Sequence, residues 1–177
     1  RSNGKAYEVK PNQKSPFACV TSFAPYSFEM IEMPMIFSEL FSFFDRTLPS
    51  KNMIYALKIE GDFTHVRTRS VPKQDAYKPL VEVAREQPEF LFQDISGVMV
   101  GFWTPNFLDK ITVPGYHLHF LTDDRNKGGH LLDCKTKKIK ISIQHISRVE
   151  LSLPITLDFM TRDLNRDISS DLKEAEN

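Results

Sequence analysis

The amino-acid sequence predicts an α+β fold, with a mostly antiparallel or mixed β-sheet, a barrel-like C-terminal part and a few short helices. Segments that alternate apolar and polar residues, as half-buried strands do, outnumber segments with helical spacing. The 177 residues, 41% hydrophobic and 26% charged, are enough for a real core in one compact domain or two small ones. We divide the chain into an N-terminal α/β part with a mixed sheet, residues 1–104, and a β-barrel-like part with a metal site, residues 105–177.

The N-terminal part contains one clear amphipathic helix. Its apolar residues recur at helical spacing from Phe37 to Leu48, Ser38 or a neighbouring residue caps its start, and Pro49 ends it. Pro79 near the first turn and Pro88 after the end predict a short helix over 79–87. Alternation and turn residues predict strands over 16–23, 52–60, 62–69, 89–93 and 97–104, with Gly61 as the turn of a hairpin.

The C-terminal part is predicted to be mainly β. Residues 115–133 form a hairpin, and residues 137–143 and 148–153 alternate as half-buried antiparallel strands do. A helix over 157–164 follows, and a charged tail begins at Asn165.

Charge and composition exclude several partner classes. The 23 basic and 23 acidic residues cancel, so we expect neither nucleic acid nor an anionic membrane surface as partner, and small substrates remain. No apolar run reaches the roughly 20 residues that span a bilayer. The two cysteines, Cys19 and Cys134, make no disulfide framework, and we expect a cytoplasmic protein. Because the chain opens with Arg1 and not with methionine, the alternative is a protein whose signal peptide was lost upstream.

Three of the five histidines lie around one glycine-rich turn within residues 115–133. Alternation along a strand places His117 and His119 on one face, and the Gly-Gly turn brings His130 back toward them. Three neutral imidazoles leave a bound zinc ion with its double charge and at least one open coordination position, which is typical of catalytic sites.

The alternative is that these histidines are ordinary polar strand residues, which is the usual role of an isolated histidine. His65 and His145 have no such neighbours in the sequence, and we interpret both as surface or structural residues. The His-x-His pair with a third histidine across the turn favours a metal site.

The same segment resembles a known family. Pro-Gly-Tyr-His-Leu-His-Phe, followed by Asp-Asp-Arg-Asn-Lys-Gly-Gly-His-Leu-Leu-Asp, is similar to the motif of α-acetolactate decarboxylase. The resemblance covers nearly the whole chain from about Ser15 onward, because further short blocks occur in the family's order: 14–17, 48–52, 55–56, 66–69, 86–88, 100–105 and 153–154.

The resemblance implies a homodimeric, zinc-dependent carboxy-lyase that converts 2-acetolactate to (R)-acetoin and carbon dioxide. His117, His119 and His130 match the family's zinc histidines one for one. Acetolactate is a β-keto acid, so the loss of its carboxylate leaves an enediolate, whose negative charge a cation at the ketone and hydroxyl oxygens stabilises.

The resemblance also implies two catalytic residues, Arg69 and Glu176. Arg69 matches an arginine to which both carboxylate binding and proton delivery are attributed, and the planar, weakly acidic guanidinium suits the first role better. Without the resemblance, Arg67 and Arg69 would be read as a solvated strand face. Glu176 aligns with a C-terminal glutamate that approaches the zinc, and Glu174 is the alternative.

The chain departs from the family at its start. The family carries an upstream Leu-Asp-Gly-Glu stretch whose glutamate contributes to the metal site, and nothing equivalent precedes Gly4 here. We expect a fragment, and the alternative is a member that has lost one ligand.

Two rival functions remain at this point. One is a zinc-binding β-barrel without catalysis, such as a sensor. The other is a cupin-type metal enzyme, which requires a glutamate shortly after the second histidine, where residues 121–124 read Leu, Thr, Asp and Asp. An arginine that faces the metal is needed by a lyase but not by a sensor, so the position of Arg69 discriminates between them.

Overall fold

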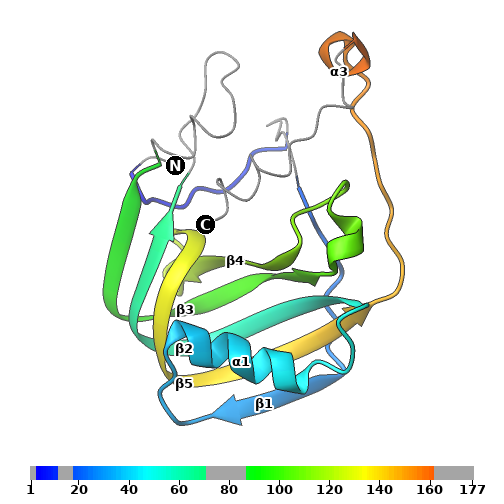
Figure 1. Cartoon of the computed structure of the whole chain (residues 1–177). Helices are drawn as coiled ribbons and strands as arrows, with labels where there is room; N and C mark the ends of the chain where they lie inside the picture. The colour runs from blue at the N-terminus through cyan, green and yellow to red at the C-terminus, as the bar shows by residue number, and fades with distance from the viewer. Residues whose placement is uncertain (1–2, 12–17, 71–86, 162–177) are drawn as a thin grey trace.

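The structure is a computed structural model that describes residues 3–11, 18–70 and 87–161. Five antiparallel strands form one sheet in the order β1-β5-β2-β3-β4 (Figure 1). The strands are β1 (Ser27–Ile31), β2 (Ile54–Arg69), β3 (Glu89–Thr104), β4 (Gly115–Thr122) and β5 (Gly128–Ile146). All pairings among these described strands are antiparallel, so the mixed sheet expected for the N-terminal part is not found in them.

The sheet curls back on itself at one end. Strand β5 pairs with β2 along most of its length and also with β4, but the second pairing covers only three residue pairs, from His119↔His130 to Leu121↔Gly128. The α+β class is therefore confirmed, whereas the expected barrel is replaced by a curled sheet closed by one short hairpin ladder. Strands from both sides of residue 104 belong to this sheet, and the division of the chain there stays a prediction.

Helix α1 (Phe37–Thr47) packs across one face of the sheet (Figure 1). Its Leu40 and Phe44 are fully buried against apolar residues of the strands, which include Leu57, Ile59, Met99, Ile141 and Ile143. Burial of one such side chain contributes about 1.5–3 kcal/mol. The predicted helix is confirmed, but its N-cap is Ile36, whose amide donates to the Glu39 carboxylate at 2.9 Å, and not Ser38.

The long strands are not interrupted where glycine and turn residues suggested. Residues 52–69 do not form a hairpin at Gly61, because β2 runs straight through it between β3 and β5. Gly61 adopts φ +147° and a Cβ there would lie 2.2 Å from the Lys138 carbonyl oxygen, so this glycine permits close approach of β5. Strand β3 is likewise continuous from Glu89 to Thr104, although Asp94 within it has a positive φ of 46°. The expected break between residues 93 and 97 is therefore wrong.

The remaining expected elements differ from the structure or are described only in part. The expected strand over 16–23 is wrong for its described residues, and the nearest strand is β1 at Ser27–Ile31. Residues 148–153 alternate as predicted but pair with none of the described strands. A 3-10 turn covers Asn106–Leu108, and α3 covers Leu157–Thr161 of the helix expected over 157–164. Most of the predicted helix over 79–87 lies outside the described residues.

Candidate metal centre

The three histidines meet at the end of the curled sheet. His119 and His130 are direct cross-strand partners in the β4–β5 hairpin, and His117 precedes His119 by two residues on the same face of β4. Each of the three ring pairs has centroids 4.7 to 5.3 Å apart. The prediction that the hairpin brings these three side chains together is therefore confirmed.

The turn between the two strands is fixed by its own polar groups. The Thr122 hydroxyl donates to the Asp124 carboxylate at 2.5 Å, and the Asn126 amide donates to the same oxygen at 3.0 Å. These hydrogen bonds, that of Thr122 above all, hold the pKa of Asp124 below its usual value. Arg125 takes the left-handed conformation, with φ 57°. A turn ordered in this way sets the hairpin register, and with it the pairing of His119 and His130.

The donor set fits a zinc ion. One ligand nitrogen from each histidine lies within 4.8 Å of the others, and the Nε2 atoms of His117 and His119 are 3.0 Å apart. Two imidazole nitrogens bound tetrahedrally to one zinc, each at about 2.0–2.1 Å, lie roughly 3.3 Å from each other. The present spacing is therefore close to that of ligands in one coordination sphere, and imidazole nitrogens are ligands that suit zinc.

Arg69 lies beside this cluster. It ends β2, directly opposite His130 of β5, and only 8% of its surface is exposed. Arg69, His119 and His130 line one cavity of about 440 Å³. The structure thus brings a buried guanidinium to the same cavity as two of the three histidines.

The other candidate residues are placed as follows. Arg67, two residues earlier, points elsewhere and pairs with Glu89 at 3.1 Å on the surface. His65 pairs with Asp133 at 3.0 Å, and the ring of His145 packs on Tyr26 with centroids 5.2 Å apart, in agreement with structural roles. Glu176 and Glu174 lie outside the described residues.

One wall of the cavity was missed by the sequence analysis. It is formed by residues 5–8, because the N-terminal segment adds to the hairpin through the Ala6 amide, which donates to the Asn126 carbonyl at 2.8 Å. Gly4 fits there with φ +69°, where a Cβ would lie 2.7 Å from the Phe90 ring. This contact joins residues more than 80 positions apart, and nothing in the local sequence pattern predicts it.

The family model of alpha-acetolactate decarboxylase matches residues 1–166 of this chain. The chain belongs to the alpha-acetolactate decarboxylase family. That family is one of carboxy-lyases, so the chain is a member of an enzyme family, and the cupin alternative is disfavoured.

Within the described residues, no helix is long and apolar enough to cross a membrane.

Known members of the alpha-acetolactate decarboxylase family align over nearly all of this chain. The relative from Bacillus licheniformis is 39% identical over 99% of this chain and 70% of its own length. The relative from Methanosarcina mazei is 38% identical over 99% of this chain and 62% of its own length. This chain therefore spans roughly two thirds of the length of these relatives.

Solved structures agree with this assignment. The crystal structure of alpha-acetolactate decarboxylase from Bacillus subtilis strain 168 has a TM-score of 0.93 and 36% identity, and it covers 99% of this chain and 76% of that chain. A Staphylococcus aureus protein of unknown function, described as similar to alpha-acetolactate decarboxylase, has a TM-score of 0.82 and 31% identity, with 89% of this chain and 68% of that chain covered. The curled sheet with its β4–β5 hairpin is thus the fold of the family.

Proposed function

We propose that the protein to which this chain belongs decarboxylates 2-acetolactate to (R)-acetoin and carbon dioxide, with a zinc ion held by His117, His119 and His130. The observation that carries the proposal is the gathering of three histidine nitrogens beside a cavity that His119, His130 and the buried Arg69 line. Membership of the alpha-acetolactate decarboxylase family supports the substrate and the reaction.

The reaction breaks the bond between the carboxylate carbon and the carbon that bears the hydroxyl. Its electron pair moves into the neighbouring ketone, which gives an enediolate, and one proton added to the carbon that lost the carboxylate gives acetoin. A bound zinc ion supplies Lewis-acid stabilisation of the negative charge that develops on oxygen.

Arg69 is the residue of this chain that we propose binds the substrate carboxylate. Its guanidinium can donate two parallel hydrogen bonds to a carboxylate, and its burial beside His130 fixes the direction from which the carboxylate is held. A guanidinium is a very weak acid, so proton delivery from Arg69 would require a water or another acid as relay. We propose Glu176, with Glu174 as the alternative, for a further role at this site on the family resemblance alone.

The competing candidate is a zinc-binding family member without catalysis, such as a sensor. Arg69 favours the lyase, because a sensory or structural metal site needs no buried cation beside its ligands. A homodimer and a cytoplasmic location are likewise proposed, the first from the resemblance and the second from composition.

An acetoin assay tests the function directly. Full-length, zinc-replete protein should form acetoin from 2-acetolactate well above the spontaneous rate, because the site stabilises the developing enediolate. Removal of zinc by a chelator should abolish the excess, and readdition of zinc should restore it. Folded, zinc-loaded protein that forms no acetoin above the spontaneous rate would favour the sensor.

A further inference from the structure

Strand β4 is held unevenly along its length. Strand β3 pairs with all of β4, from Gly115 to Thr122, whereas β5 pairs only with residues 119–121. His119 and His130 therefore lie where β4 has strand neighbours on both sides. His117 lies in the part of β4 that has a single neighbour among the described strands, so backbone pairing constrains its position less than that of His119.

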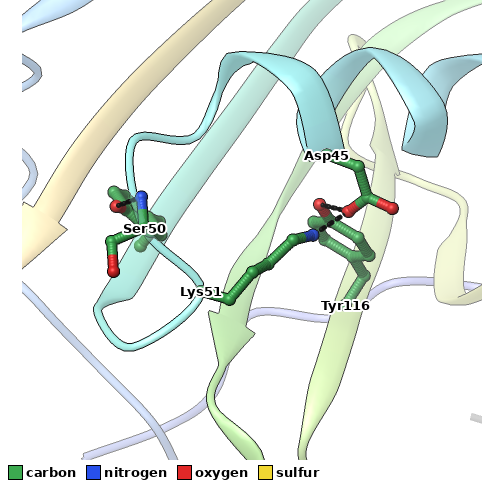
Figure 2. Close-up of polar contacts among 5 residues, drawn as sticks. Asp45, Ser50, Lys51 and Tyr116 are labelled. Atoms are coloured by element: carbon green, nitrogen blue, oxygen red, sulfur yellow. Dashed lines mark hydrogen bonds and ion pairs between the residues drawn. The ribbon is translucent and has the colours of Figure 1, made fainter.

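Tyr116 anchors this singly paired part of β4 to helix α1. Its ring stacks on Phe41 with centroids 4.7 Å apart and an interplanar angle of 11°, and it packs on Trp103 at 4.6 Å. Its hydroxyl donates to the Asp45 carboxylate at 2.6 Å, near the C-terminal end of α1. Figure 2 shows the phenol pointing at that carboxylate.

Lys51 completes the contact from the loop after α1. Its ammonium forms an ion pair with the same Asp45 oxygen (Figure 2). The ammonium also lies 4.3 Å from the centre of the Trp103 ring. Asp45, Lys51 and Tyr116, which we call the Asp45 cluster, thus connect the helix, the loop and the singly paired part of β4. Helix α1 is itself anchored by buried Leu40 and Phe44.

Successive side chains of a strand point to opposite faces, so Tyr116 contacts α1 while His117 points to the metal centre. Because the two residues are adjacent in β4, a shift of the Tyr116 backbone also moves His117, whose side chain lies on the other face of the strand. We propose that Asp45 and Tyr116 are positioning residues for the metal centre, which act by holding the singly paired part of β4 so that His117 meets His119 and His130. The inference rests on the proposed zinc site.

A purely structural role for the cluster predicts a different outcome. It would lower the stability of the whole protein, but the folded molecules would bind zinc as tightly as before. A positioning role predicts weaker zinc binding by protein that is fully folded, because energy is then needed to order β4 when His117 binds. Zinc affinity, measured well below the melting temperature, separates the two roles.

The test compares zinc affinity of full-length variants by competition with a chelating dye. Tyr116→Phe removes only the hydroxyl, and we expect zinc binding about three- to tenfold weaker. Asp45→Asn keeps an acceptor for Tyr116 but loses the ion pair with Lys51, so its effect should be smaller. Tyr55→Phe is the matched control: it removes only the hydroxyl that accepts a hydrogen bond from the Ser50 amide at 3.1 Å, and this variant should bind zinc as wild type does.

A second readout needs no metal. In zinc-free protein, amide hydrogen exchange at residues 115–118 should become faster in Tyr116→Phe, while exchange at 119–121 stays unchanged. Equal zinc affinity and equal exchange in Tyr116→Phe and wild type would overturn the inference. Wild-type protein that binds no zinc would refute the metal site itself, and unchanged exchange at 115–118 would then still refute the role of the cluster. If Tyr116→Phe does not fold, zinc affinity and amide exchange are compared between Asp45→Asn and wild type instead, and equal values in both measurements would overturn the inference.

Discussion

Arg69 has two proposed roles that its position allows to be separated. The guanidinium is buried at the end of β2 beside His130, which suits a fixed two-point contact with a carboxylate. Arg67 provides a natural comparison on the same strand, because it is 46% exposed and pairs with Glu89 instead of facing the cavity. The same substitution at the two positions therefore tests position and not residue type.

Arg69→Lys keeps the charge but loses the two-point contact. If Arg69 anchors the substrate carboxylate, we expect KM to rise about ten- to hundredfold with zinc content unchanged. If Arg69 controls protonation instead, kcat should fall or the acetoin should lose its handedness, because the face of proton addition is no longer fixed. Steady-state kinetics and chiral chromatography distinguish the two roles.

Arg67→Lys serves as the control and should leave kinetics and product handedness as in wild type. An Arg69→Lys variant with wild-type rate, KM and enantiomeric purity would remove Arg69 from the active site altogether.

Helix α1 and strand β4 are joined by a charged contact that depends on pH. The ammonium of Lys51, followed by the Tyr116 hydroxyl, lowers the pKa of the Asp45 carboxyl by hydrogen bonding. Burial, together with the Asp45 carboxylate, raises the pKa of the Tyr116 hydroxyl, which therefore stays a hydrogen-bond donor at all ordinary pH values. Ionised Asp45 is the form that the folded protein favours.

Asp45→Asn tests this contact through the pH dependence of stability. The folded pKa lies below the unfolded value of about 3.9, so the stabilisation is present above that value and is lost as pH falls through the folded pKa. Because both partners of the ion pair are about half exposed and screened by solvent, we expect wild type to melt only slightly above Asp45→Asn near pH 7, and the difference should shrink as the pH approaches 2. Thermal melts followed by circular dichroism measure it, and a difference independent of pH would contradict the assignment.

Over the whole molecule, the sequence predicted best what depends on neighbouring residues. The histidine hairpin follows from alternation and a glycine-rich turn, and the helix ending before Pro49 follows from its apolar spacing. Gly61 was misread because a glycine inside a long strand has the same local pattern as a turn. The difference lies in the close approach of β5, a contact between distant segments.

The parts of the site that escaped prediction are also non-local. Residues 5–8 line the cavity because of backbone pairing with the hairpin turn, and Asp45 meets Tyr116 across 71 positions of sequence. Arg69 could be singled out only through the family resemblance, since its burial comes from the surrounding sheet and not from its neighbours in sequence. Residues that gather by folding carry no periodic signal of their own.

Metal analysis of full-length protein tests the central claim, that His117, His119 and His130 form one zinc centre. Their ligand nitrogens lie within 4.8 Å of one another, close enough for all three to bind the same metal ion. We predict about one zinc per chain in wild type and near-complete loss in His130→Ala, while His145→Ala, at a histidine packed on Tyr26, retains the metal. Unchanged zinc content in all three single alanine variants of the triad would contradict the claim.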